Sequence, residues 1–152
     1  MTDATGSRRI VVGVDGSDHS RHALEWAIAE AEHTGAVVRV VLAYDSGLAW
    51  IDVGSDAEAL MLAHSAENAK KVLHETLAAV DLPHEDAVRV LPVTIEGEAA
   101  RVLVDAADDA DLLVVGSRGR GGFTGLLLGS VSQRCAERSP CPVVVVPSAK
   151  AT

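Results

Sequence analysis

Aromatic residues are scarce in this 152-residue chain, in which Phe, Trp and Tyr together make up only 3% of the sequence. The core must therefore be built from Ala, Val, Leu and Ile side chains. A hydrophobic content of 48% excludes a disordered chain, and a chain of this length can fold without disulfides or metals. We expect a single domain over residues 1–152, with an ordered core at about 8–147.

Long apolar runs and excess positive charge are also missing. No apolar run approaches the roughly 18 residues that a membrane-spanning helix needs, and residues 1–9 contain no apolar signal core. Asp and Glu (22) outnumber Lys and Arg (13), for a formal charge of -9. This balance disfavours binding to nucleic acids and to anionic membranes. We therefore expect a cytoplasmic protein that binds neither.

Cysteine is limited to Cys135 and Cys141, which do not form a C-x-x-C pattern. In a reducing compartment we expect both to be free, buried thiols. A regulatory disulfide between them is the alternative that the spacing leaves open.

Five short β-branched runs are present, and helical patterns separate them. Most runs are continuously apolar, which is typical of strands buried on both faces of a parallel sheet. Their alternation with helices predicts an α/β fold, a single doubly wound five-stranded parallel sheet with helices on both faces. The predicted strands are Ile10–Val14, Val37–Ala43, Ala87–Val93, Leu112–Val115 and Val143–Val146.

Capping residues mark the predicted helix ends. Ser17 is expected to cap the first helix and Gly35 to end it. The third helix is expected to start near Gly97. The second and fourth helices are expected to begin with capping boxes, formed by Ser55 with Glu58 and by Ser130 with Gln133.

Glycine is concentrated in one segment, because six of the 13 glycines lie between positions 116 and 129. The segment follows the fourth predicted strand and leads into a helix N-terminus. Glycine lets backbone N–H groups approach a ligand closely, and the helix N-terminus adds unpaired donors. With Arg118 and Arg120 in the same segment, we interpret it as a phosphate cradle. The alternative is a flexible surface loop with two solvated arginines.

Other nucleotide and hydrolase motifs are incomplete. The chain contains no G-x-x-x-x-G-K-(S/T) sequence, and Thr124 interrupts a possible G-x-G-x-x-G. Val115 occupies the first glycine position of a nucleophile elbow around Ser117. A P-loop NTPase, a Rossmann dehydrogenase and a serine hydrolase are therefore disfavoured.

Asp15 comes at the carboxyl end of the first predicted strand. With strand order 3-2-1-4-5, the first and fourth strands flank the topological switch point, where ligands bind. Asp15 would then face the glycine-rich loop. A carboxylate there can accept from ribose hydroxyls or reach a metal held by phosphates, and the alternative is a turn or capping aspartate.

Three segments resemble the universal stress protein family, specifically its ATP-binding branch. Ile10–Ser17 and Cys141–Pro147 are similar to that family's opening and closing segments. The resemblance extends over about residues 8–147. The glycine-rich loop matches the branch's G-2x-G-9x-G-(S/T) signature at Gly116, Gly119, Gly129 and Ser130.

The resemblance implies strand order 3-2-1-4-5, a homodimer through the last strand Val143–Val146, and a role in stress response, dormancy or signalling. It implies ATP as the ligand, with Mg²⁺ or Mn²⁺ as candidate companions and AMP or cyclic AMP as alternative ligands. Asp15 is the candidate metal contact. The predicted site combines the residues that the resemblance implies with the two arginines of the loop. It consists of Val14, Asp15, Ala43, Val115, Gly116, Arg118, Gly119, Arg120, Gly129, Ser130, Val131 and Ser132.

We therefore expect an ATP-binding regulator with an unidentified protein partner, and not an enzyme. The loop has no phosphate-binding lysine, and the motifs offer no general base. Slow ATP hydrolysis or phosphoryl transfer, aided by Arg118 or Arg120, is one alternative. A nucleotide-free interaction scaffold is another.

Overall fold

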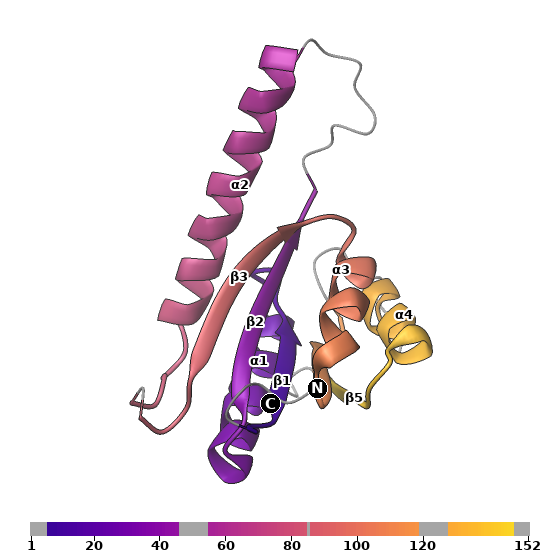
Figure 1. The fold of residues 1–152 in the computed structure, drawn as a ribbon. Coiled ribbons are helices and arrows are strands. Elements are labelled where there is room, and N and C mark those ends of the chain that lie inside the picture. Colours follow the sequence, from indigo (N-terminus) through magenta and orange to yellow (C-terminus); the bar gives the residue numbers. More distant parts are fainter. Residues whose placement is uncertain (1–5, 46–54, 85, 119–127, 148–152) are drawn as a thin grey trace, which may run out of the picture.

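The fold is a parallel α/β sheet covered by helices, seen in a computed structural model that describes residues 6–45, 55–84, 86–118 and 128–147. Five parallel strands are arranged in the order β3-β2-β1-β4-β5, which confirms the predicted fold (Figure 1). In chain order the elements are β1 (Arg9–Gly13), α1 (Asp18–Thr34), β2 (Val37–Tyr44), α2 (Ser55–Ala78), β3 (Val90–Glu96), α3 (Ala99–Ala106), the 3₁₀ turn η2 (Ala107–Asp109), β4 (Leu112–Gly116), α4 (Ser130–Arg138) and β5 (Val143–Val146).

The two faces of the sheet carry separate cores, which explains why the strands are continuously apolar. On one face Val12 and Val114 pack with α1 and α2, and on the other Val11 and Leu113 pack with α3 and α4. Figure 1 shows α3 and α4 together on one side, with α1 on the opposite side of the sheet. Consecutive strand residues point to opposite faces, and both faces are buried, so every position favours an apolar side chain.

Most strand boundaries lie within one residue of the predicted ones, but β3 was misplaced. It runs from Val90 to Glu96 rather than from Ala87 to Val93. The amides of Ala87 and Val88 donate to the carbonyl of His84 at 2.8 and 3.3 Å, which makes this segment a turn. Val88 is buried, with 4% of its surface exposed. Its apolar character therefore reflects packing and not strand geometry.

The first helix has the predicted ends, but one other predicted cap is wrong. Ser17 caps α1 by accepting from the amide of Ser20, and Gly35 ends it in the left-handed conformation at φ 74°. Ser130, by contrast, is the first residue of α4, and Gly129 is its N-cap. The side chain of Gln133 donates to Glu137 at 3.3 Å instead of turning back to the cap.

The other predicted helix starts have mixed outcomes. The third helix, α3, starts at Ala99, two residues after Gly97 and directly after its N-cap Glu98. Helix α2 begins at Ser55 itself, and the side chains of the capping box expected there lie outside the described residues.

The two edges of the sheet are β3 and β5. Pro92 lies within β3, and because proline has no N–H to donate, this position suits an edge strand. β5 pairs with β4 along one side, from Leu113 with Val143 to Gly116 with Val146. Both cysteines are free, as predicted, but only Cys135 has the predicted burial, since Cys141 is half-buried. Among the described helices, none has the length and apolar character needed to cross a bilayer.

Candidate functional site

The predicted site residues that the structure describes lie at or near the carboxyl ends of β1, β2 and β4 and at the N-terminus of α4. β1 pairs with β4 in parallel, with Val12 opposite Val114, and with β2 on its other side. The chain leaves β1 toward α1 on one face and leaves β4 toward α4 on the other. This is the switch point at which α/β sheets bind ligands, and Asp15 and Gly116 stand on its two sides.

Asp15 forms a turn that positions its carboxylate directly after β1. Its Oδ1 accepts from the amide of Ser17 at 2.9 Å, and its own amide donates to Ser20 Oγ at 3.2 Å. Gly16 between them has φ 86°, a conformation that favours glycine. The turn reading of Asp15 is therefore confirmed. The carboxylate is half-buried, held at the carboxyl end of the sheet.

Val14 and Val115 have only backbone groups to offer at the carboxyl end of the sheet, because their side chains pack into the cores. They are 5% and 3% exposed and pack into opposite cores. The amide of Val14 donates to the carbonyl of Val41 at 2.9 Å. Ala43 lies near the end of β2 and is half-buried.

Gly116 has a packing reason to be glycine. A Cβ atom there would lie 2.9 Å from the carbonyl oxygen of His19 and 3.3 Å from that of Arg118. His19 belongs to the first turn of α1, so the absence of a side chain lets this turn approach the end of β4.

The N-terminus of α4 presents backbone donors toward the same edge. The first intrahelical hydrogen bond runs from the amide of Gln133 to the carbonyl of Gly129, at 3.0 Å. The amides of Ser130, Val131 and Ser132 precede that bond, and N–H groups in the first turn of a helix have no intrahelical partner. They carry the positive end of the helix dipole and favour an anion.

Ser132 is placed differently from the other members of this set. Its side chain is buried, with 3% exposed, and its hydroxyl donates to the carbonyls of Ser117 and Gly129, both at 3.0 Å. Arg118 is half-buried directly after Ser117. Gly119 and Arg120 lie outside the described residues.

A pocket that sequence reasoning missed opens between the end of β2 and α2. Its volume is about 240 Å³. Ala43 lines it, so the pocket adjoins the position expected to meet a base. His64 and Asn68 are four residues apart, which places them on one face of a helix, and this spacing was the signal available. The lining residues are Leu42, Ala43, Tyr44, Asp45, His64, Ser65, Asn68, Ala69 and Val72.

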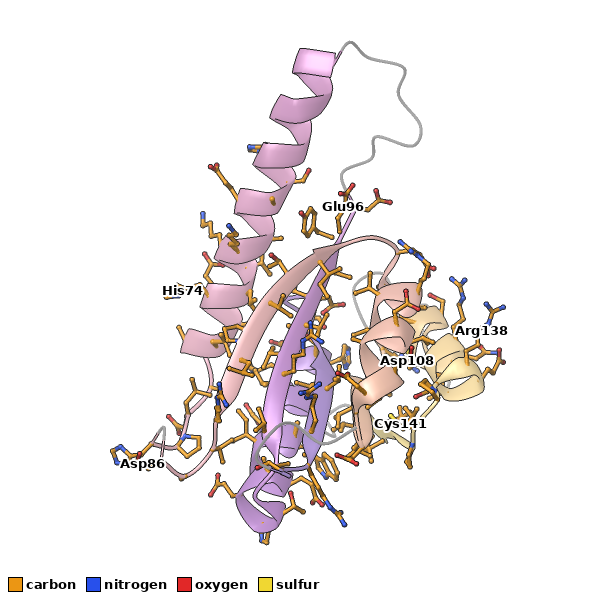
Figure 2. The ribbon with its side chains drawn as sticks, in the orientation of Figure 1. His74, Asp86, Glu96, Asp108, Arg138 and Cys141 are labelled. Carbon is orange, nitrogen blue, oxygen red and sulfur yellow. The ribbon has the colours of Figure 1, made fainter. Side chains whose placement is uncertain are left out.

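Neither cysteine belongs to this site. Burial, and secondly the negative charge of Glu98, raise the pKa of Cys135 to about 11, which keeps the thiol protonated and inert. Cys141 precedes β5, and Figure 2 shows it toward the opposite end of the sheet from Glu96. Within the described residues, no three His, Cys, Asp or Glu side chains lie close enough to hold a metal ion.

The comparisons with known proteins agree with this geometry. The model of the universal stress protein family matches residues 6–147. A universal stress protein of Thermus aquaticus is 38% identical over 141 residues, which cover 91% of this chain and 98% of the relative. A universal stress protein of Mycolicibacterium smegmatis is 39% identical over 90% of this chain but only 45% of its own length.

A solved structure provides the link to a ligand. A universal stress protein in complex with cAMP superimposes with a TM-score of 0.66 and 29% identity, covering 93% of this chain and 98% of that one. That protein binds an adenine nucleotide on the same fold. With the family model matching nearly its whole length, this chain belongs to the universal stress protein family.

Proposed function

We propose that this protein is an adenine-nucleotide-binding regulator, with ATP as its ligand. The observation that carries the proposal is the convergence of Asp15 and the first turn of α4 at the switch point between β1 and β4. One group accepts hydrogen bonds and the other donates them. A nucleotide presents the matching pair, because ribose hydroxyls donate and phosphates accept.

Each part of the edge has a role in this proposal. The Asp15 carboxylate accepts from the ribose, and the backbone near Ala43 meets the adenine. The amides of Ser130 and Val131 bind phosphate oxygens, with the helix dipole adding to their attraction. Arg118 adds positive charge beside the phosphates.

Gly119 and Arg120 complete the phosphate set by resemblance alone. Mg²⁺ or Mn²⁺ would arrive bound to the phosphates, since the described side chains contain no cluster of three ligands. Asp15 is the candidate protein contact for that ion. Its Oδ1 already accepts from the Ser17 amide at 2.9 Å, so phosphate oxygens would supply most of the coordination.

The first test is to denature the purified protein and identify any released nucleotide by mass spectrometry. Calorimetric titration with ATP–Mg²⁺, AMP and cAMP then ranks the ligands, and cAMP is included because of the related complex. Asp15→Asn removes the charge but keeps an oxygen that can accept from Ser17, so we expect the turn to survive and ATP binding to weaken. Asp108→Asn makes the same charge change at an exposed residue of η2 and serves as the matched control.

The outcomes separate the alternatives. Weaker ATP binding by Asp15→Asn alone supports the site, whereas equal weakening by both variants indicates a general charge effect. If neither wild-type ATP nor cAMP binding is detected, the chain is a nucleotide-free scaffold. ATP turnover that Asp15→Asn abolishes would favour the enzyme reading over the regulator.

We also propose a cytoplasmic homodimer that assembles through β5. The carbonyl of Pro142 accepts from the amide of Leu113 in β4, and the carbonyl of Val146 accepts from the amide of Ser117 directly after β4, both at 2.9 Å. The polar backbone groups of Val143 and Val145 therefore point away from β4. An edge strand with such outward-pointing groups is a template for pairing. A second copy of β5 provides the matching strand.

A further inference from the structure

We propose that Ser132 is a positioning residue that holds the first turn of α4 against the end of β4, and that phosphate binding depends on this connection. The inference deepens the proposed function and rests on it. Ser132 then acts through the backbone of its neighbours, and its side chain does not contact the ligand.

Two hydrogen bonds connect the two ends of the glycine-rich loop. The amide of Gly129 donates to the carbonyl of Ser117 at 2.7 Å. The hydroxyl of Ser132 donates to that same carbonyl at 3.0 Å, and to the carbonyl of Gly129 also at 3.0 Å. A hydroxyl has one proton, so these two contacts form a single shared, three-centre bond.

The connection is anchored in the sheet. Ser117 follows the last residue of β4, and its amide donates to the carbonyl of Val146 in β5 at 2.9 Å. Its carbonyl therefore projects from a strand end whose position is set by the sheet. Ser132 reaches this carbonyl from the first turn of α4, and so fixes the helix N-terminus relative to β4.

Burial separates this role from direct ligand binding. Ser132 is 3% exposed and Ser117 is 8% exposed, while Ser130 on the same turn is exposed. A hydroxyl that is enclosed and already donating to two carbonyls has no proton left for a phosphate oxygen. Ser132 therefore contributes to phosphate binding through its backbone amide and by holding the first turn of α4 in place.

Loss of the hydroxyl should act on phosphates selectively. The Gly129 amide would still donate to the carbonyl of Ser117, but the first turn of α4 would lose its second tether, the Ser132 hydroxyl. Hydrogen bonds weaken steeply when donors move out of line, and a preformed cradle binds more tightly than one that must be ordered on binding. The base and ribose contacts, near β1 and β2, do not depend on this tether.

The test compares Ser132→Ala, Ser132→Thr and Ser132→Val in calorimetric titrations with ATP–Mg²⁺, AMP and adenosine. Thr and Val have nearly the same shape, but only Thr keeps the hydroxyl. We expect the Kd for ATP to rise about fivefold to tenfold in the Ala and Val variants, the range for losing one hydrogen bond. Adenosine binding should change less than about twofold, and Thr should restore ATP binding relative to Val.

Thr76→Val is the matched control for deleting a buried hydroxyl. Thr76 is 7% exposed on α2, and its hydroxyl donates to the carbonyl of Val72 at 2.8 Å. It lies outside the loop, so ATP binding should not change. Equal losses of ATP and adenosine binding in Ser132→Ala, or similar losses in Thr76→Val, would show a general folding defect and overturn the inference.

A second measurement needs no nucleotide. Hydrogen exchange by NMR should show faster exchange of the Gly129 amide in Ser132→Ala than in wild type or Ser132→Thr, because the adjoining tether is gone. Unchanged exchange would overturn the positioning role. If wild type binds no nucleotide but exchange changes as expected, the proposed function fails while the connection within the loop stands.

Discussion

Replacing Gly116 by alanine tests whether the close approach of α1 to β4 requires a glycine at the end of β4. The new Cβ would lie 2.9 Å from the carbonyl oxygen of His19, 3.0 Å from its carbonyl carbon and 3.3 Å from the carbonyl oxygen of Arg118. All three are backbone atoms, so no side chain can rotate away. The first turn of α1 must shift, together with the Asp15 turn that leads into it.

The expected size of the effect follows from two opposing terms. Overpacking costs about 1–3 kcal/mol, and rigid backbone neighbours favour the upper part of that range. Alanine also lowers the chain entropy of the unfolded state, which stabilises by about 0.4–1 kcal/mol. Gly116 does not have a positive φ, so alanine adds no backbone strain. We expect a net loss of about 1–2.5 kcal/mol in the free energy of unfolding.

Urea denaturation measures this loss, provided that the dependence of the free energy of unfolding on urea concentration is the same in the variant and the wild type. Gly13→Ala is the matched comparison, since it carries the same unfolded-state effect and also lacks a positive φ. The three atoms nearest to its Cβ would all belong to the side chain of Leu103, with Cδ1 at 2.6 Å, and methyl groups at the end of a leucine can move. If Gly116→Ala loses no more stability than Gly13→Ala, the argument from rigid backbone is refuted.

Four further predictions concern other parts of the fold. The pKa of Cys135 is raised from 9.0 to about 11, so the folded state keeps the thiol proton to a higher pH than the unfolded state, and the free energy of unfolding should fall as the pH rises through this interval. Urea denaturation at a series of pH values from 8.5 to about 11 should show a smaller fall in Cys135→Ala than in wild type. An equal dependence of the free energy of unfolding on pH in the two proteins would contradict this prediction. Under native conditions alkylation followed by mass spectrometry should label the half-exposed Cys141 before the buried Cys135, whereas equal labelling would show that α4 opens readily. Val145→Pro removes a backbone N–H of β5 that points away from β4, so light scattering should show a monomer in place of the proposed dimer, without unfolding of the chain. A variant that is still dimeric would show that the interface does not lie at β5. The Arg134–Glu98 ion pair has its nitrogen and oxygen atoms 2.6 Å apart, and both side chains are about half exposed. A double-mutant cycle should give a coupling energy of about 0.2–1 kcal/mol, which weakens in high salt. A larger coupling energy that does not depend on salt would show that the pair does not behave as a solvent-exposed ion pair.

The architecture was predictable because it follows from local patterns. Continuous apolar runs appear where both faces of a strand are covered, and Ser17 and Gly35 end a helix through contacts within a few residues. The apolar pattern gave a wrong strand boundary where a residue is buried without being part of a strand. Val88 is apolar because it packs into the core, yet it lies in a turn before β3.

The sequence proposed the residues of the candidate site, but not how the described ones lie. Asp15 and Gly129 were proposed because glycine-rich loops and strand-end carboxylates are visible in the sequence. Ser130 was taken for a cap, since a serine followed three residues later by glutamine fits a capping box, but the helix begins one residue earlier than that pattern requires. The pocket beside Ala43 needed α2 to be placed in space.

The sequence by itself determined the fold class, because alternating strands and helices show in its local periodicity, and its motifs indicated the family and the candidate site through their resemblance to known proteins. Only the tertiary structure decided what individual residues do at close range. Gly116 must be small because α1 passes within 2.9 Å of the position a Cβ would take. Ser132 faces inward because its hydroxyl meets the carbonyl of Ser117, 15 residues earlier in the chain. Such contacts join segments that the chain itself separates, so their distances exist only once the sheet and its helices have packed.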